Sequence, residues 1–237
     1  MNFNIKVLQV VNIGGFEFYF TETMLSILVI MAVLIAFAVV VRLKLRKFEE
    51  KPKGFQNAIE AIIEMFDNFF NNSAGEKLSF LAPWFFMVFA FVLVSNLSGI
   101  LFIGLLRPPT ADWGVTFTLA LVTFGLIQVM GVKYQKGTYI RGFFEPYFFS
   151  KVPNFLLFPL NLIGELARPV SLSFRLFGNI LGGMILMGLI YGMAPIFVRI
   201  GIPAALHAYF DLFAGALQAF VFSVLSLTYI GIVAETE

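Results

Sequence analysis

Apolar segments as long as a bilayer is thick constrain this chain more than any other feature. A transmembrane helix needs about 20 mostly apolar residues, and five segments reach that length: 22–41, 80–106, 113–132, 154–191 and 201–233. Only 13% of the 237 residues are charged, about half the share found in soluble proteins. The sequence therefore predicts an all-α polytopic membrane protein, a single membrane domain with about five transmembrane helices.

The fourth and fifth segments each exceed one perpendicular crossing by roughly ten residues or more. Helices of that length must tilt strongly, bend or lie partly along the membrane. Pro159 and Pro169 are the expected bending points of the fourth segment. Both segments are therefore expected to depart from a simple perpendicular crossing.

Residues 54–72, between the first two spans, show a different pattern. Apolar residues recur there at helical spacing, and polar residues occupy the opposite side. The apolar set is Phe55, Ile59, Ile62, Ile63, Phe66 and Phe70, and the polar set is Glu60, Glu64, Asp67 and Asn68. The pattern predicts an amphipathic cytoplasmic helix on the membrane surface or against a partner. A short connecting helix that covers its neighbours fits equally well.

Basic residues concentrate on one side of the predicted spans. The loop after the first span, the start of the second and the loop after the third hold Arg42, Lys44, Arg46, Lys47, Lys51, Lys53, Lys77, Lys133, Lys136, Arg141 and Lys151. The opposite side holds only Lys6, Arg107 and Arg199. By the positive-inside rule the rich loops are cytoplasmic. Residues 1–20 are then an external N-terminal segment, and residues 235–237 lie inside.

The sequence lacks the patterns of several kinds of site. It contains no cysteine and one histidine, His207, which excludes disulfides, thiolate metal sites and multi-histidine metal sites. A net charge of +2 gives no support to nucleic-acid binding. The chain has no glycine-rich phosphate loop followed by Lys-Ser or Lys-Thr. We therefore expect no metal, no cofactor and no nucleotide site on this chain.

The polar and small residues of the last two spans follow one another at steps of three or four. They are Arg168, Ser171, Arg175, Gly178, Asn179 and Gly182 on the fourth span, and His207, Asp211, Gly215 and Gln218 on the fifth. Each set occupies one helix face, and Glu165 is one turn from Arg168, close enough to pair with it. Small residues at this spacing are also typical of close packing, and Asn179 and Gln218 of interhelical hydrogen bonds.

Arg175 is the most informative of these residues. Arginine keeps its charge in proteins, and placing it at the bilayer centre costs about 3 kcal/mol on insertion scales. A dedicated buried ion pair would add little net stability, so a structural role explains the residue poorly. Arg175 is therefore predicted to face an anion that the chain accommodates or meets.

Two runs of the sequence resemble the signature of subunit a of F-type ATP synthases. They are residues 165–179 (ELARPVSLSFRLFGN) and residues 211–222 (DLFAGALQAFVF). Weaker agreement appears at Pro83, at residues 95–99 and at residues 109–112. The resemblance covers nearly the whole chain in the family's order, so the chain is identified as a member of this family.

In that family, subunit a is the stationary partner of a rotating ring of c subunits, each with one carboxylate inside the membrane. Two aqueous half-channels end near the ring without meeting. The resemblance implies that Arg175 lies between them, favours the ionised form of an arriving carboxylate and blocks direct ion passage. It implies that Asn179, Asp211 and Gln218 belong to the outer half-channel or support the arginine, and that Ser171 and Arg168 line the inner half-channel. His207 and Glu165 are additional half-channel candidates.

The resemblance also implies the surroundings of the chain. The last two helices would form a strongly tilted hairpin around the ring, and the basic loop and amphipathic helix would dock the peripheral-stalk b subunits. The coupled ion would be a proton or sodium. Because the chain shows no transit peptide, a bacterial plasma membrane is expected, with the N-terminus outside and the C-terminus cytoplasmic.

The chain departs from its relatives at one informative position. Many relatives carry an acidic residue after the small pair Gly182-Gly183, where this chain has Met184. The hypothesis is that Asp211 is the main titratable group of the outer half-channel, with water in the space left by the two glycines. Asp112 or Glu17 are further candidates.

Three other functions stay open at this point, and one of them, a purely structural membrane scaffold, would leave Arg175 without a reason. A stand-alone ion channel or transporter would need its own coupling-ion site, and no second buried carboxylate stands convincingly beside Asp211. An intramembrane enzyme built on His207 and Asp211 would lack a nucleophilic cysteine and a metal-ligand set.

Overall fold

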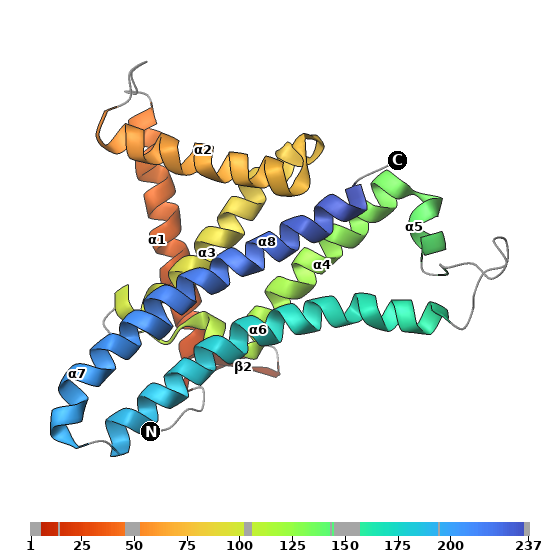
Figure 1. Ribbon diagram of the computed structural model, residues 1–237. Coiled ribbons are helices and arrows are strands. Elements are labelled where there is room, and N and C mark those ends of the chain that lie inside the picture. Colours follow the sequence, from red (N-terminus) through yellow and green to blue (C-terminus); the bar gives the residue numbers. More distant parts are fainter. Residues whose placement is uncertain are drawn as a thin grey trace.

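A computed structural model of the chain describes residues 6–13, 15–45, 53–101, 106–142, 144, 157–193 and 195–234. Within them, five helical segments are long and apolar enough to cross a membrane: Glu22–Leu45, Glu76–Leu101, Trp113–Gln135, Phe158–Met193 and Ile202–Ala234. Figure 1 shows these helices with little other structure between them. The prediction of an all-α polytopic membrane protein is confirmed.

The first four spans are built from single long helices. They are α1 (Glu22–Leu45), α3 (Ala82–Leu101), α4 (Trp113–Gln135) and α6 (Leu157–Met193). The 3₁₀-helix η1 (Glu76–Leu81) leads into α3, the 3₁₀-helix η2 (Pro109–Ala111) precedes α4, and the short helix α5 (Gly137–Gly142) follows it. Pro169 lies inside α6, and the helix continues through it.

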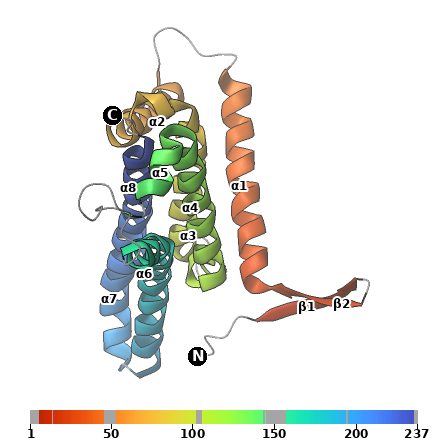
Figure 2. The same cartoon turned by 90° about the vertical axis from the view of Figure 1, so that its right-hand side faces the viewer.

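The last span is a composite of three helical pieces. Helix α7 (Ile196–His207) is followed directly by the π-helix η3 (Ala208–Ala214) and then by α8 (Gly215–Ala234). The uninterrupted apolar pattern of residues 201–233 gave no sign of the π-helix. Figures 1 and 2 show α6 and α7 side by side where a turn joins them. The predicted tilt of this hairpin in a membrane stays a prediction.

Helices α3, α4, α6 and α8 form the packed centre of the molecule. One apolar cluster gathers around Phe70, Phe85 and Leu227. A second joins all four helices and includes Val92 of α3 and Leu176 of α6. Buried Ser and Thr hydroxyls within these helices mostly donate to carbonyls one turn earlier, as Thr123 does to Leu119 (2.9 Å). Most of these hydroxyls are thus satisfied inside an apolar core, whereas those of Ser95 and Ser223 have no partner among the described residues.

Helix α2 (Phe55–Ala74) is the predicted amphipathic helix, and it lies across one end of the molecule (Figure 1). Its buried apolar residues include Ile59, Phe66 and Phe70, whereas Ile62 and Ile63 stay exposed. The helix packs against α8. Half of its apolar face therefore covers neighbouring helices, and half is left for a membrane surface or a partner.

Residues near the N-terminus form a feature that the sequence reading missed. Strands β1 (Val7–Ile13) and β2 (Phe16–Thr21) pair antiparallel, with Gly15 at φ +91° in the turn. The signal was present as aromatic residues alternating along β2 after a glycine turn. Figure 2 shows this hairpin lying across the foot of α1.

Helix α1 stands apart from the packed centre (Figure 2). Only 11% of its membrane-spanning window is buried, compared with 22–44% for the other four spans. Its buried residues, Thr23, Ser26 and Ile30, lie toward the end next to the hairpin. Most of its surface is therefore apolar and open to lipid or a partner.

Some sequence predictions fall on residues outside the described part of the chain. These are the cytoplasmic placement of residues 235–237, the basic residues Arg46, Lys47, Lys51 and Lys151, and the start of the fourth span at 154–156.

Candidate functional site

Arg175 lies midway along α6, on the face that no other described helix covers. The side chain is exposed, as are Ser171, Gly178 and Gly182 at steps of three or four residues. Phe174 beside it is 53% exposed. Among the described residues, no carboxylate forms an ion pair with Arg175. The predicted stripe is therefore an open helix face with one unpaired cation on it.

Toward the N-terminal end of α6, two further charges neutralise each other. Nη1 of Arg168 lies 3.0 Å from Oε2 and 3.1 Å from Oε1 of Glu165. The Glu165 side chain is only 13% exposed, whereas Arg168 is 39% exposed and stacks over the ring of Tyr229 at 4.9 Å. The pair was expected from the one-turn spacing, and its carboxylate faces inward.

Two residues from neighbouring helices continue this polar group. Gln128 of α4 donates from Nε2 to Glu165 Oε1 (3.0 Å), and the Tyr139 hydroxyl of α5 donates to Gln128 Oε1 (2.7 Å). Burial, and then the negative charge of Glu165, raises the pKa of Tyr139 above its ordinary value. The hydroxyl therefore stays protonated and keeps its donor role at physiological pH.

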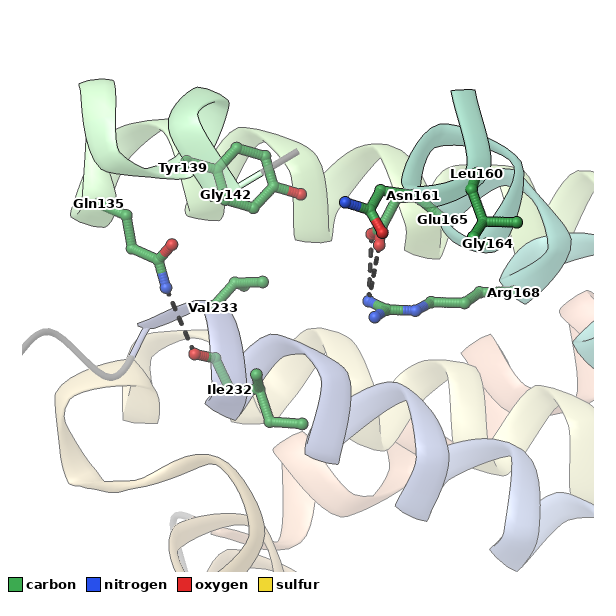
Figure 3. Close-up of a pocket in the computed structure, with 10 residues that line it drawn as sticks. All are labelled: Gln135, Tyr139, Gly142, Leu160, Asn161, Gly164, Glu165, Arg168, Ile232 and Val233. Carbon is green, nitrogen blue, oxygen red and sulfur yellow. Dashed lines mark hydrogen bonds and ion pairs between the residues drawn. The ribbon is translucent and has the colours of Figure 1, made fainter. Parts of the chain in front are cut away.

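This group borders a pocket of about 490 Å³ between α4, α5, α6 and α8. Its lining includes Gln135, Tyr139, Asn161, Glu165 and Arg168. Figure 3 shows the Glu165–Arg168 pair on one side and Tyr139 on the other. The cavity is roomy and polar enough to hold several waters, next to an ionisable carboxyl.

A second polar group lies at the opposite end of α6. Nδ1 of His207, the last residue of α7, contacts Oδ2 of Asp211 in η3 at 2.5 Å. The Tyr191 hydroxyl of α6 lies 3.2 Å from His207 Nε2. With His207 donating from Nδ1, Nε2 accepts from Tyr191. The hydrogen bonds thus connect α6 to the composite last span around one carboxylate.

Glycines on α3 and α6 lie next to this group, and one of them corrects a prediction. A Cβ on Gly99 would lie 3.9 Å from Asp211 Oδ2. A Cβ on Gly183 would lie 3.3 Å from Phe210, so that aromatic side chain, not water, takes the space beside Gly183. Gly182 has no such neighbour within 4 Å. The expected water space is therefore wrong for Gly183, because close helix packing fills it.

The structure does not join the remaining candidates to either polar group. Asn179 is half-buried, and its shielded side-chain nitrogen donates to no described residue. Gln218 is half-buried on α8. Asp112 caps α4 by accepting from the Gly114 N–H (2.9 Å), which gives it a local structural role.

The site also contains residues that the sequence reading missed. Gln128 could have been recognised from the sequence, because it is a polar side chain in the middle of an apolar span. Tyr139 and Tyr191 gave none, because an aromatic near a span end is common in membrane proteins. Asn96 on α3 fixes the start of α8 by donating to the Gly215 carbonyl (2.8 Å) and accepting from Thr110 (2.7 Å).

Within the described residues, no group of three or more His, Cys, Asp or Glu side chains could hold a metal ion. What the chain offers instead is two paired carboxyls near opposite ends of α6 and a free cation between them along the helix.

The sequence is similar to known proteins along most of its length. The family model described as ATP synthase A chain matches residues 24–231. The chain is 35% identical to ATP synthase subunit a of Mycoplasmoides gallisepticum, covering 88% of this chain and 77% of the relative. It is 34% identical to the sodium-ion-specific subunit a of Propionigenium modestum (94% and 78% covered) and 33% identical to subunit a of Moorella thermoacetica (96% and 96%).

Proposed function

Because the chain belongs to the ATP synthase A chain family, we propose that it is the stator subunit that couples ion flow to rotation of a c-ring. The chain is a multi-pass membrane protein with five apolar helices in its described part. The proposal concerns three finer roles: which residue couples ion flow to rotation, which groups carry the ion, and which subunits bind this chain.

The observation that carries the proposal is the exposed, unpaired guanidinium of Arg175 on an open face of α6. A cation facing lipid would be costly, whereas a cation facing a membrane-embedded carboxylate is stabilised by it. A ring of c subunits supplies such carboxylates in turn. Arg175 would release the ion from each arriving carboxyl and hold that carboxylate until rotation moves it on.

The two polar groups support separate access paths to this arginine. On the outer side, Asp211 would exchange ions with water, oriented by His207, while Asn179 and Gln218 line the path toward the ring. The unpaired Asn179 nitrogen would be satisfied by water in such a path. On the inner side, Glu165, Arg168 and Ser171 would line the path that begins at the pocket.

Rotation is required because the two paths would not meet. The cation of Arg175 stands between them and repels an ion that would hop directly. Each charge that crosses then carries about 2.3 kcal/mol per 100 mV into rotation. Nucleotide chemistry would belong to other subunits of the complex.

The exposed surfaces support a proposal for the partners, and the basic loops support one for the orientation. The open face of α6 would contact the c-ring, and α1 with the exposed half of α2 would contact the b subunits of the peripheral stalk. The N-terminal hairpin would lie outside a bacterial plasma membrane and the C-terminus in the cytoplasm. The P. modestum relative is sodium-specific, so both proton and sodium are candidate ions.

ATP-driven ion uptake into inverted membrane vesicles tests the proposal. The native complex is compared with Arg175→Ala and with Lys133→Ala, which removes an exposed cation at the end of α4. Proton uptake is followed by lumen acidification and sodium uptake with a radioactive tracer. We expect uptake of one ion by the native complex and Lys133→Ala, and none by Arg175→Ala.

Uptake by Arg175→Ala at the native rate would show that Arg175 is structural and that the coupling mechanism is wrong. A second measurement addresses a stand-alone channel. The purified chain in liposomes without c subunits should show no coupled conduction, and a selective ion current from the chain alone would favour the channel instead.

A further inference from the structure

Tyr139 lies outside every predicted site, yet its hydroxyl begins a chain of hydrogen bonds that ends at a carboxylate. The Tyr139 hydroxyl on α5 donates to Oε1 of Gln128 on α4 (2.7 Å), and Nε2 of Gln128 donates to Oε1 of Glu165 on α6 (3.0 Å). Three separate elements thus converge on one carboxyl beside the pocket.

We propose that Tyr139 is a positioning residue of the inner access path: through Gln128 it orients Glu165 and sets the pH range in which the pocket delivers protons to the ring. This inference rests on the function proposed above. Tyr139 itself need not contact the transported ion.

The Tyr139 ring packs directly against the backbone of α4. A Cβ on Gly131 would lie 2.7–2.9 Å from three atoms of that ring, distances that real side chains do not adopt. The ring therefore rests directly on the glycine, one turn along α4 from Gln128. Only a residue without a side chain at position 131 lets the hydroxyl reach the Gln128 amide from this side.

The amide of Gln128 explains how the effect is transmitted. A glutamine presents either its oxygen or its NH₂ group. Because Tyr139 donates to the amide oxygen, the NH₂ group is turned to Glu165, and a donor at that position favours the charged carboxylate. Without the hydroxyl, the amide is free to turn its oxygen toward Glu165, which favours the protonated carboxyl instead.

The other charged and titratable groups near Glu165 are few within the described residues. Arg168 pairs with it on α6, Tyr139 faces it from α5, and Tyr229 of α8 lines a small cavity with both members of the pair. Figure 3 shows Tyr139 and Gln135 opposite the Glu165–Arg168 pair. Tyr139 is the member of this set whose hydroxyl is linked to Glu165 through Gln128, and it can be changed without removing a charge.

The experiment is the pH dependence of ATP-driven proton uptake in inverted vesicles, whose cytoplasmic face is exposed to the medium. Tyr139→Phe keeps the ring on Gly131 and removes only the hydroxyl. We expect the alkaline limb of its pH–rate profile to move up by about one pH unit, the size expected for one hydrogen bond to a charged group. Gly131→Ala, which displaces the ring, should move the limb in the same direction.

Two controls separate positioning from a general structural effect. Tyr134→Phe removes a hydroxyl from the same end of α4 and should leave the profile in place. In a Glu165→Gln background, Tyr139→Phe should produce no movement, because the group it acts on is gone. Bound ATPase activity confirms that each complex assembles.

An unchanged profile in Tyr139→Phe would overturn the inference, and so would an equal movement in the Glu165→Gln background or in Tyr134→Phe. Failure of the proposed function has a different signature. It appears as native pumping by Arg175→Ala in the same vesicles, whatever Tyr139→Phe does.

Discussion

At the scale of single residues, Arg175 differs from the paired charged residues of the last two spans because its charge has no partner within the described part of the chain. Arg168 and Asp211 each have a partner within about one turn of helix: Glu165 balances the charge of Arg168, and His207 contacts the carboxylate of Asp211. Arg175 has no such partner among the described residues and lies on an exposed face. An unbalanced charge in an apolar setting requires an external partner, which makes Arg175 the residue to test first.

Asp211→Asn should slow ion-driven ATP synthesis by about tenfold or more, because an amide cannot carry a proton. The measurement is ATP synthesis in vesicles energised by an imposed ion gradient. Asp112→Asn is the matched control, since asparagine caps α4 as well as aspartate does. A near-native rate for Asp211→Asn would remove Asp211 from the outer path, whereas an equal loss in Asp112→Asn would make Asp112 a member of that path as well.

Asn96→Leu should lower the stability of the assembled chain. It leaves Thr110 without an acceptor and the Gly215 carbonyl without a side-chain donor. In a membrane protein such losses are worth roughly 1–2 kcal/mol. The melting temperature of the detergent-solubilised complex measures this loss. Thr110→Val should lower the melting temperature less in the Asn96→Leu background than in the native chain. Equal decreases in both backgrounds would mean that the two residues act independently.

The candidate site was predictable only where its contacts are local. The Glu165–Arg168 pair and the His207–Asp211 pair follow from spacings of three and four on one helix, and both are present. The Gln128–Glu165 bond joins residues 37 positions apart, and no periodicity reveals which face of α4 meets α6. Gly183 was misread for the same reason, because its neighbour Phe210 belongs to another helix.

At the scale of elements, spans were predictable because length and apolarity alone define them. The boundaries moved by a few residues, from 22–41 to Glu22–Leu45 for the first span. The hairpin of β1 and β2 was not predicted, although aromatic residues alternate along β2 in the segment expected to be external. The π-helix η3 could not be predicted, since an apolar run with helical spacing looks the same for both helix types.

Gly231→Ala should destabilise the packing of α2 against α8. The added Cβ would lie 2.8 Å from the Ser73 carbonyl oxygen and 3.2 Å from Ala74 Cα, and backbone atoms cannot move aside as a side chain does. Overpacking of this kind costs roughly 1–3 kcal/mol. Melting of the solubilised complex measures it. Gly125→Ala on α4, where nothing lies within 4 Å, is the control and should melt at the native temperature.

At the scale of the whole molecule, α1 and the hairpin form a peripheral unit beside the packed helices (Figure 2). The exposed apolar surface of α1 is therefore the part of the chain that a neighbouring membrane subunit can cover without disturbing the core. Its two ends also provide the simplest test of how the chain crosses the membrane.

Single cysteines should report this crossing cleanly, because the chain has none of its own. Phe18→Cys on the hairpin and Lys53→Cys before α2 are both at exposed positions on opposite ends of α1. An impermeant thiol reagent should label Phe18→Cys in intact cells and Lys53→Cys in inverted vesicles. Reversed labelling would invert the orientation derived from the basic loops.

The π-helix η3 also sets the angular phase of the last span, that is, the direction of the side chains before it relative to those after it. Each residue of an α-helix advances the direction of its side chain by about 100°, and a π-helical turn holds more residues than an α-helical one. His207 can thus be directed toward Tyr191 of α6, while Asp211 lies beside Gly99 and Gly215 packs closely on Asn96, both on α3. Deleting one residue from Ala208–Ala214 would reset that phase, rotating the end of the span that carries His207 against the end that packs on α3 without changing any side chain in either.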